Sequence, residues 1–307
     1  MTVVCLPDAE AADCVGVLPD GIDVVIWKGT GAPVPGIEGV EVLVPGYMGP
    51  PVSSESLEVF TSLRMIQLVS AGVDSWLKRV PVGVILCNGR GVHGGSTAEL
   101  AVGGIVSSLR EFPRLRDAQR AHRWERHGNT AGLDGTRVLV LGAGDIGSRI
   151  AASVAPLGAQ VTLVARHPRE GVRGLTELAA LLPEHQVVVI AVPYTTQTHQ
   201  LVDAAFLSSM PDGALLVNIA RGAIVDTDAL LAELTSQRLH AFLDVTEPEP
   251  LPADHPLWSA PNLQLTPHVG GGTVGWQQRA YRLVREQLIR FHRGEPLHNV
   301  VTIAEQY

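Results

Sequence analysis

The stretch Leu139-Val140-Leu141-Gly142-Ala143-Gly144-Asp145-Ile146-Gly147 joins a short apolar run to three glycines spaced G-x-G-x-x-G. In a strand–turn–helix of this kind, the first glycine permits the tight turn and the second lets the backbone approach a pyrophosphate. The third lets the helix pack closely on the strand. The helix start offers free N–H groups to the phosphates. We therefore expect a dinucleotide site, with contacts from Gly142, Gly144, Asp145, Ile146 and Gly147.

The chain on both sides of this motif alternates short apolar runs with longer amphipathic stretches, which is typical of parallel sheets covered on both faces. Downstream, we expect strands at 137–141, 160–164, 187–192, 214–219, 240–245 and 263–266. Upstream, we expect strands at 3–6, 23–27, 40–44, 65–69 and 84–87, with helices near 9–17 and 53–63. Residues 276–293, stopped by Gly294, predict a last long helix. The pattern predicts an α/β protein with two doubly wound parallel-sheet domains and a cleft between them.

The connection between the two series has its own signals. Ser96 and Glu99 fit a capping box, which predicts a helix that starts with Ser96 as its N-cap. Residues 100–111 are apolar and small, so we expect that helix to be buried. Residues 114–132 are polar and basic and predict a surface arm. Trp124 within this arm is a candidate anchor for a partner subunit.

Composition excludes several classes of protein. A length of 307 residues predicts about two domains at roughly 150 residues each. The formal net charge of −8 argues against a nucleic-acid-binding protein. No apolar run approaches the roughly 18 residues of a membrane span, and the N-terminus carries no basic leader. The cysteines Cys5, Cys14 and Cys87 form no C-x-x-C pair. We therefore expect a cytoplasmic protein with reduced thiols and no membrane association.

The end of the second strand of the downstream series predicts which dinucleotide is bound. A site for NAD places Asp or Glu there, to accept the ribose 2′-hydroxyl. Here Ala165 takes that position, and Arg166, His167 and Arg169 follow. A guanidinium group can bind a 2′-phosphate through two parallel hydrogen bonds. We expect NADP(H) to be preferred over NAD(H); the alternative is an ordinary solvated basic loop.

Six further motifs, in order along the chain, resemble those of the D-2-hydroxyacid dehydrogenase family. They read Val69-Ser70-Ala71-Gly72-Val73-Asp74, Leu133-Asp134-Gly135-Thr136, Pro193-Tyr194-Thr195-Thr196-Gln197-Thr198, Asn218-Ile219-Ala220-Arg221-Gly222, Asp244-Val245-Thr246-Glu247-Pro248-Glu249-Pro250 and Thr266-Pro267-His268-Val269-Gly270-Gly271. The resemblance covers nearly the whole chain. The sequence departs from the pattern at the missing ribose acid and at Thr246, where the family usually has an aromatic residue.

The resemblance implies a layout for the whole chain. Residues 1–96 with 270–307 would form a discontinuous, flavodoxin-like catalytic domain that binds the substrate. Residues 97–269 would form the Rossmann dinucleotide-binding domain. Family members are usually homodimers joined through the cofactor domain, so the resemblance also implies a homodimer.

The resemblance further implies site residues. Arg221, Glu249 and His268 match the family's catalytic trio, and the loop with Ala71, Gly72 and Val73 matches the one that holds the substrate carboxylate. Further cofactor contacts would come from Pro193, Thr198, Ala220, Asp244 and Gly270. For Asp244 the alternative is a structural role at the end of a strand.

The residue types suit hydride transfer to a 2-keto acid. The carbonyl oxygen that becomes negative needs a proton donor, and histidine serves that role near neutral pH. A carboxylate beside the ring would orient it; Glu249 is the candidate, and Glu247 is its competitor. Arg221 could hold the substrate carboxylate and polarise the carbonyl. The N–H groups of Ala71, Gly72 and Val73 could complete an anion nest.

The sequence therefore predicts an oxidoreductase that transfers hydride between NADP(H) and a small 2-keto or D-2-hydroxy acid, such as glyoxylate or hydroxypyruvate. A dinucleotide-sensing corepressor or scaffold on the same fold is the alternative, because fold alone does not fix function. Histidine spacing predicts no metal site. The substrate side chain is not readable from the sequence. Tyr47, Met48, Trp76, His93 and Trp276 are candidate pocket walls, and each could equally lie in the core.

Overall fold

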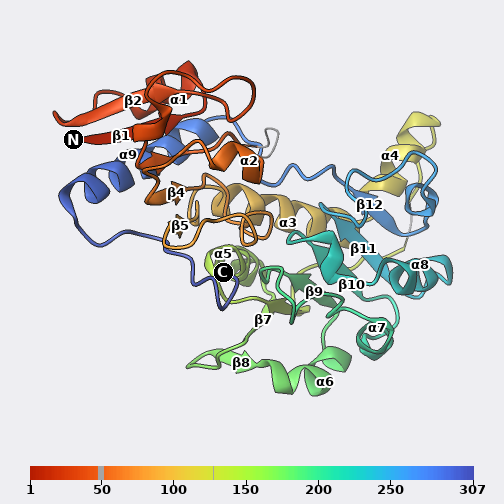
Figure 1. Ribbon diagram of the computed structural model, residues 1–307. Helices are drawn as coiled ribbons and strands as arrows, with labels where there is room; N and C mark the ends of the chain where they lie inside the picture. The colour runs from red at the N-terminus through yellow and green to blue at the C-terminus, as the bar shows by residue number, and fades with distance from the viewer. Residues whose placement is uncertain (48–51, 127) are drawn as a thin grey trace. The chain divides into compact units, whose positions relative to one another are not determined.

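The computed structural model describes residues 1–47, 52–126 and 128–307, so the candidate pocket wall Met48 lies outside the described residues. The chain divides into two compact units. The first comprises Met1–His93 and Thr273–Tyr307, and the second comprises Gly94–Gly272. Both units are α/β and contain one parallel sheet each (Figure 1).

The first unit has a five-stranded sheet in the order β2-β1-β3-β4-β5, which is the order of flavodoxin-like folds. Its strands are β1 (Thr2–Leu6), β2 (Ile22–Ile26), β3 (Val42–Leu43), β4 (Met65–Gln67) and β5 (Ile85–Cys87). Its helices are α1 (Ala9–Val15), α2 (Ser54–Leu57) and α9 (Trp276–Arg293), with a 3₁₀ turn, η1, at Ile37–Gly39. Every strand pair is parallel.

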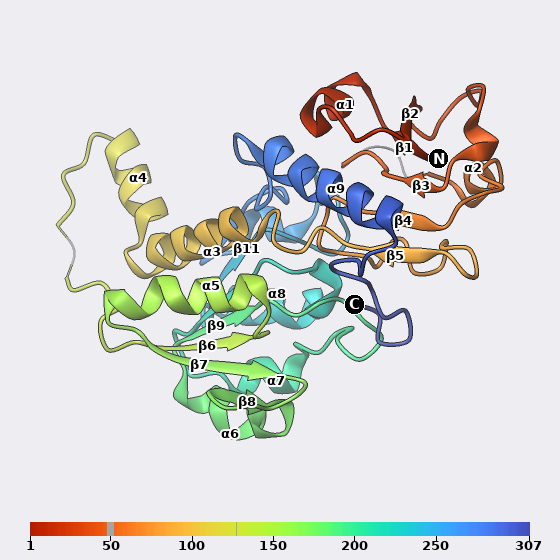
Figure 2. The same cartoon turned by 90° about the vertical axis from the view of Figure 1, so that its left-hand side faces the viewer.

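Strand alternation gives this sheet two buried faces. Val4, Leu6 and Val42 point to the face that α1 and α9 cover, while Cys5 and Leu43 point to the other. The C-terminal helix α9 lies beside α1 in both views (Figures 1 and 2) and buries Ala280, Tyr281, Val284 and Leu288 against the first face. The last helix of the chain therefore completes the core of the N-terminal unit.

The second unit has a seven-stranded parallel sheet in the order β12-β11-β10-β9-β6-β7-β8. This is the Rossmann order with one strand added at an edge. The strands are β6 (Arg137–Leu141), β7 (Gln160–Ala165), β8 (Val172–Gly174), β9 (Val187–Ile190), β10 (Leu215–Asn218), β11 (His240–Leu243) and β12 (Leu263–Leu265). Helices are α3 (Gly94–Leu109), α4 (Phe112–Arg120), α5 (Asp145–Val154), α6 (Leu178–Leu181), α7 (Ala204–Ser209) and α8 (Thr227–Thr235). Short 3₁₀ turns lie at Ala155–Leu157 (η2), Leu175–Glu177 (η3), Leu182–Glu184 (η4), Gly222–Ile224 (η5) and Pro256–Ser259 (η6).

The helices of this unit divide between the two faces of the sheet. Helices α3 and α5 lie side by side on one face (Figure 2), and they pack on strand residues such as Val138 and Val140. The opposite face buries Leu139 and Leu141 under residues of α6, α7 and α8. Strands buried on both faces explain why β6 and β9 read as continuous apolar runs in the sequence.

Several details differ from the sequence predictions, among them the start of α3, the edge strand β8 and the end of α2. Helix α3 begins at Gly94, so Ser96 lies inside it and the predicted N-cap is wrong. Gly94 packs directly on the Asp145 side chain, since a Cβ at that position would meet the Asp145 carboxylate unless it shifted. The short edge strand β8 was not predicted, and α2 ends at Leu57 rather than near residue 63.

Within the described residues, no helix combines the length and apolar composition needed to cross a membrane.

Candidate active site

The glycines of the loop between β6 and α5 are of two kinds. A Cβ on Gly142 would clash with the carbonyl of Ala191, and one on Gly147 would clash with the carbonyl oxygen of Gly142. These two glycines are needed for packing. A Cβ on Gly144 would meet nothing within 4 Å. Gly144 is also the N-cap of α5, and no side chain caps the helix there.

This geometry fits a pyrophosphate. The uncapped N-terminus of α5 presents its first N–H groups at the open side of Gly144, and the helix dipole favours an anion there. The loop follows β6, whose neighbours are β7 on one side and β9 on the other. That is the point where the strand order reverses, and it is where open α/β sheets bind ligands.

The basic loop after β7 lies beside the glycine loop. The guanidinium of Arg169 donates to the carbonyl oxygen of Ala143 at 2.8 Å, so Arg169 joins the two loops. Arg166 and His167 are exposed. Ala165 pairs with Gly174 of β8, so the short edge strand fixes the end of β7 where the loop starts.

Two other predicted cofactor contacts are in a tight turn after β9. The Thr198 hydroxyl donates to the carbonyl oxygen of Pro193 at 2.8 Å and accepts from the backbone N–H of Thr195 at 2.8 Å. Pro193 and Thr198, which were predicted to contact the cofactor, therefore belong to one folded loop at the carboxyl end of β9.

His268 and Glu249 are in direct contact. The ring Nδ1 of His268 lies 2.5 Å from Oε1 of Glu249, and because an ionised carboxylate only accepts, the ring donates this bond. Among the residues that the structure describes, none forms a hydrogen bond with Nε2 of the ring. The hydrogen bond from His268 lowers the pKa of Glu249 below its usual range, with the charge of Arg221 acting in the same direction and burial acting against both. Arg221 is thus electrostatically coupled to the pair.

Glu247 was the competing carboxylate, and it has a different place. Glu247 is exposed, and its backbone carbonyl accepts from the Thr227 hydroxyl at 3.0 Å. Between the two acidic residues of the Pro-rich loop, the one in contact with His268 is Glu249.

The backbone of His268 is held by Asp244. His268 has a φ of 52°, which is uncommon for a residue with a side chain. Its N–H donates to the Asp244 carbonyl at 2.7 Å. The Asp244 carboxylate, only 2% exposed, accepts from the Thr266 hydroxyl at 2.6 Å and from the N–H groups of Val269 and Gly270, both at 2.9 Å. Asp244 therefore fixes the loop that carries the histidine.

Asn218 is a residue whose role the sequence did not reveal. It ends β10, is 1% exposed, donates from Nδ2 to the Arg221 carbonyl at 2.8 Å and accepts from the Ala220 N–H at 3.1 Å. Arg221 in turn donates to the carbonyl of Ala220 at 2.8 Å. An amide at the end of an otherwise apolar strand was the available signal, because a buried polar side chain there must find partners.

The predicted substrate loop belongs to the first unit. Within the described part of the chain, the N–H groups of Ala71, Gly72 and Val73 donate no hydrogen bond to another residue. Three successive N–H groups after β4 are therefore available as donors to an anion.

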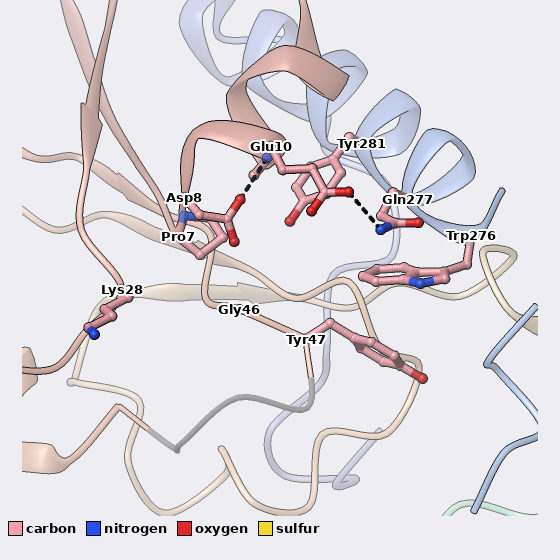
Figure 3. Close-up of a pocket in the computed structure, with 10 residues that line it drawn as sticks. Pro7, Asp8, Glu10, Lys28, Gly46, Tyr47, Trp276, Gln277 and Tyr281 are labelled. Carbon is pink, nitrogen blue, oxygen red and sulfur yellow. Dashed lines mark hydrogen bonds between the residues drawn. The ribbon is translucent and has the colours of Figure 1, made fainter. Parts of the chain in front are cut away.

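The candidate pocket walls divide into two groups. Tyr47 stacks on His93 with ring centroids 4.8 Å apart, and Trp276 lies 4.6 Å from Tyr47. Trp76 is instead 9% exposed and packs in a core cluster with Trp27 and Phe60. Tyr47 and Trp276 also line a pocket of about 300 Å³ at the carboxyl ends of β1 and β3 (Figure 3).

Among residues 1–47, 52–126 and 128–307, no group of three or more His, Cys, Asp or Glu side chains is arranged to hold a metal ion. His268 pairs with one carboxylate and His93 stacks on an aromatic ring.

Comparison with known proteins matches these features to a family. Residues 102–270 match the model of the D-isomer specific 2-hydroxyacid dehydrogenase NAD-binding domain. That segment contains the glycine loop, Arg221, Glu249 and His268. The chain belongs to the D-isomer specific 2-hydroxyacid dehydrogenase family.

Relatives of this dehydrogenase cover most of its length. An uncharacterized protein of Corynebacterium melassecola is 32% identical over 80% of this chain and 84% of its own. Glyoxylate/hydroxypyruvate reductase A of Klebsiella pneumoniae is 30% identical over 78% of this chain and 80% of its own. A crystal structure of a family member from Xanthobacter autotrophicus Py2, in complex with NADPH and MES, is 29% identical with a TM-score of 0.86. It aligns with 100% of this chain and 99% of that chain.

Proposed function

We propose that this dehydrogenase reduces small 2-keto acids, such as glyoxylate or hydroxypyruvate, to 2-hydroxy acids with NADPH. The observation that carries the proposal is the contact between His268 and Glu249, coupled to Arg221, in the segment that matches the family's NAD-binding domain. The similarity to a glyoxylate/hydroxypyruvate reductase and to a family member in complex with NADPH supports it.

The chemistry follows from the residues. Bound NADPH supplies a hydride to the carbonyl carbon of the keto acid. Arg221 holds the substrate carboxylate and stabilises the negative charge that develops on the carbonyl oxygen. His268 gives a proton from Nε2 to that oxygen, so the product is a neutral alcohol beside the carboxylate. Glu249 accepts from Nδ1, which holds the ring and stabilises its positive charge before transfer.

We assign the two units separate roles. The second unit binds the dinucleotide through the glycine loop, the residues 193–198 turn, Ala220, Asp244 and Gly270. The first unit contributes the N–H groups of Ala71, Gly72 and Val73 to the substrate carboxylate. The predicted domain limits, 1–96 with 270–307 and 97–269, are part of this proposal.

The preference for NADPH rests on the loop after β7. Ala165 stands where an NAD-specific site has an acidic side chain, the exposed Arg166 follows it, and Arg169 is bonded to the glycine loop. A 2′-phosphate would find two guanidinium groups there and no carboxylate at position 165.

We place the reaction in the cytoplasm.

We also propose a homodimer joined through the second unit. Trp124 is 90% exposed and Phe112, at the start of α4, is 51% exposed, and aromatic side chains are enriched at the anchor points of interfaces. Light scattering after size exclusion tests this. A dimeric wild type with a monomeric Trp124→Arg variant is expected, and a monomeric wild type would contradict the proposal.

The experiment that tests the activity is a steady-state assay of NADPH oxidation with a panel of 2-keto acids. Continuous turnover with glyoxylate or hydroxypyruvate is expected. Stoichiometric NADPH binding without turnover would instead favour the dinucleotide-sensing alternative. The presence of Arg221, Glu249 and His268 together argues against that alternative.

A further inference from the structure

We propose that Asn299, in the segment after α9, is a positioning residue for the substrate's carboxylate. It acts by holding the turn at residues 88–90, which holds the loop at residues 70–73. The inference rests on the proposed function, because it concerns how the first unit presents its N–H groups to a 2-keto acid.

Asn299 is bonded to the turn at four points. Its Nδ2 donates to the carbonyl oxygens of Arg90 at 3.0 Å and Asn88 at 3.4 Å. Its Oδ1 accepts from the Arg90 guanidinium at 3.3 Å, and its own carbonyl accepts from the Asn88 N–H at 3.0 Å. A single side chain near the C-terminus therefore fixes both ends of the turn.

The turn at residues 88–90 is itself hydrogen-bonded to the substrate loop at residues 70–73. The Gly89 N–H donates to the Ser70 carbonyl at 2.7 Å, and the Asn88 side chain donates to the Ala71 carbonyl at 3.2 Å. The two segments also touch closely, since a Cβ on Gly89 would clash with the carbonyl of Val69. A shift of the turn must therefore move the loop.

These bonds determine where the loop's N–H groups point. In a planar trans peptide, the carbonyl of one residue and the N–H of the next point in opposite directions. The carbonyls of Ser70, Ala71 and Gly72 are all held, the last by the Ser70 hydroxyl at 3.0 Å. The N–H groups of the three following residues are consequently turned the other way. Two of those three carbonyl bonds come from the turn that Asn299 holds.

The backbone of Asn299 decides which variants are informative. Its φ is 54°, in the left-handed region that glycine adopts freely and aspartate tolerates. Asn299→Gly therefore removes the amide without backbone strain. Asn299→Asp keeps an acceptor for Arg90 but removes the two Nδ2 donors. Asn262→Gly is a matched control, because Asn262 is exposed, has a φ of 58° and lies in the second unit.

The test is steady-state kinetics of NADPH-dependent reduction of glyoxylate by the full chain. Asn299→Gly and Asn299→Asp should raise KM for glyoxylate by about three- to tenfold, the scale of one or two lost hydrogen bonds. The kcat value and KM for NADPH should stay within about twofold, because neither the acid–base pair nor the glycine loop is touched. Asn262→Gly should match the wild type in all three constants.

A second readout does not depend on turnover. Deuterium uptake by the peptide covering residues 86–92 should rise in Asn299→Gly. This peptide contains the N–H groups of Asn88 and Gly89, which donate to the carbonyls of Asn299 and Ser70 and should exchange faster when the turn loosens. Calorimetric binding of oxalate, a carboxylate probe that cannot be reduced, should weaken by the same factor as KM rises.

The outcomes are distinguishable. A wild type that turns over glyoxylate, with an unchanged KM in both Asn299 variants, would overturn the inference and leave the proposed function standing. A wild type that reduces no 2-keto acid would defeat the proposed function; equal oxalate affinity in wild type and Asn299→Gly would then overturn the inference as well. A variant with a lower melting temperature and normal KM would show that Asn299 serves stability alone.

Discussion

The Nδ1 atom of His268 lies 2.5 Å from Oε1 of Glu249, although the two residues stand 19 positions apart in the sequence. Both side chains are partly accessible, His268 at 31% and Glu249 at 37%. The contact therefore orients the ring while leaving its far edge open to another molecule. The first predictions depend on this contact, because we propose that His268 and Glu249 act as an acid–base pair.

Removing the ring should stop the chemistry but not cofactor binding. We expect His268→Ala to lower kcat for keto-acid reduction by about 10²–10⁴, the usual effect of a positioned acid–base group. NADPH binding, followed by fluorescence, should be unchanged because the glycine loop is a separate element. Turnover near the wild-type value would refute the proposed role of His268.

Glu249→Gln should change the pH profile of reduction. The variant lacks the negative charge that accepts from Nδ1 of His268 and stabilises the protonated ring, which is the form that gives a proton to the substrate. The alkaline limb of kcat/KM for the keto acid should move to lower pH. Glu247→Gln is the matched control and should leave the profile in place; the opposite result would show that Glu247 is the partner.

The same contact should make stability depend on pH in acid. The pKa of Glu249 is lowered in the folded protein, so its contribution is present above the pKa of an unfolded glutamate and is lost as pH falls through the lowered value. The melting temperature of the wild type should therefore fall more than that of Glu249→Gln between pH 6 and pH 3. Parallel curves for the two proteins would rule out this contribution.

Arg166→Ala should weaken the use of NADPH selectively. We expect kcat/KM for NADPH to fall by about tenfold or more, with a much smaller change for NADH, because only NADPH carries the 2′-phosphate. Arg173→Ala is a suitable control, since Arg173 is exposed on β8 and pairs with Glu177. Equal losses for both cofactors, or a wild type that prefers NADH, would contradict the 2′-phosphate assignment.

The glycines of the loop should separate stability from binding. Gly144→Ala puts a methyl group into open space, so the melting temperature should hold while KM for NADPH rises by about tenfold or more. Gly147→Ala forces a methyl group onto the Gly142 carbonyl and should destabilise the protein by about 1–3 kcal/mol. Circular dichroism melts and NADPH titrations check both. A Gly144→Ala variant with normal NADPH affinity would show that the cofactor does not approach there.

Local sequence patterns predicted most of the helices and strands correctly, because each of these elements depends on residues that are close together in the sequence. The predicted strand 137–141 and the predicted final helix 276–293 agree with β6 and α9 to the residue. The edge strand Val172–Gly174 was missed, since its three residues contain an arginine and a glycine and pair on one side only. Ser96 was wrongly taken as an N-cap because the capping pattern cannot report that Gly94 packs against Asp145.

The site was harder to predict than the fold, for a physical reason. Its contacts join residues that are distant in sequence, and spacing alone does not fix such distances. The choice between Glu247 and Glu249 needed the coordinates, as did the role of Asp244 in holding Thr266, Val269 and Gly270. The coordinates were also required to find Asn299, because it lies far from every motif and acts through backbone carbonyls.

The exposed position of Arg166 has an evolutionary consequence. Arg166 follows β7 on the surface, while Ala165 keeps the strand in register with Gly174. Surface substitutions away from packed or bonded groups usually change stability little. In the proposed site, the choice between the two dinucleotides therefore depends on a residue that the core does not need. Descendants of this enzyme could therefore change from one dinucleotide to the other by a single substitution in this loop, without a compensating substitution in the core.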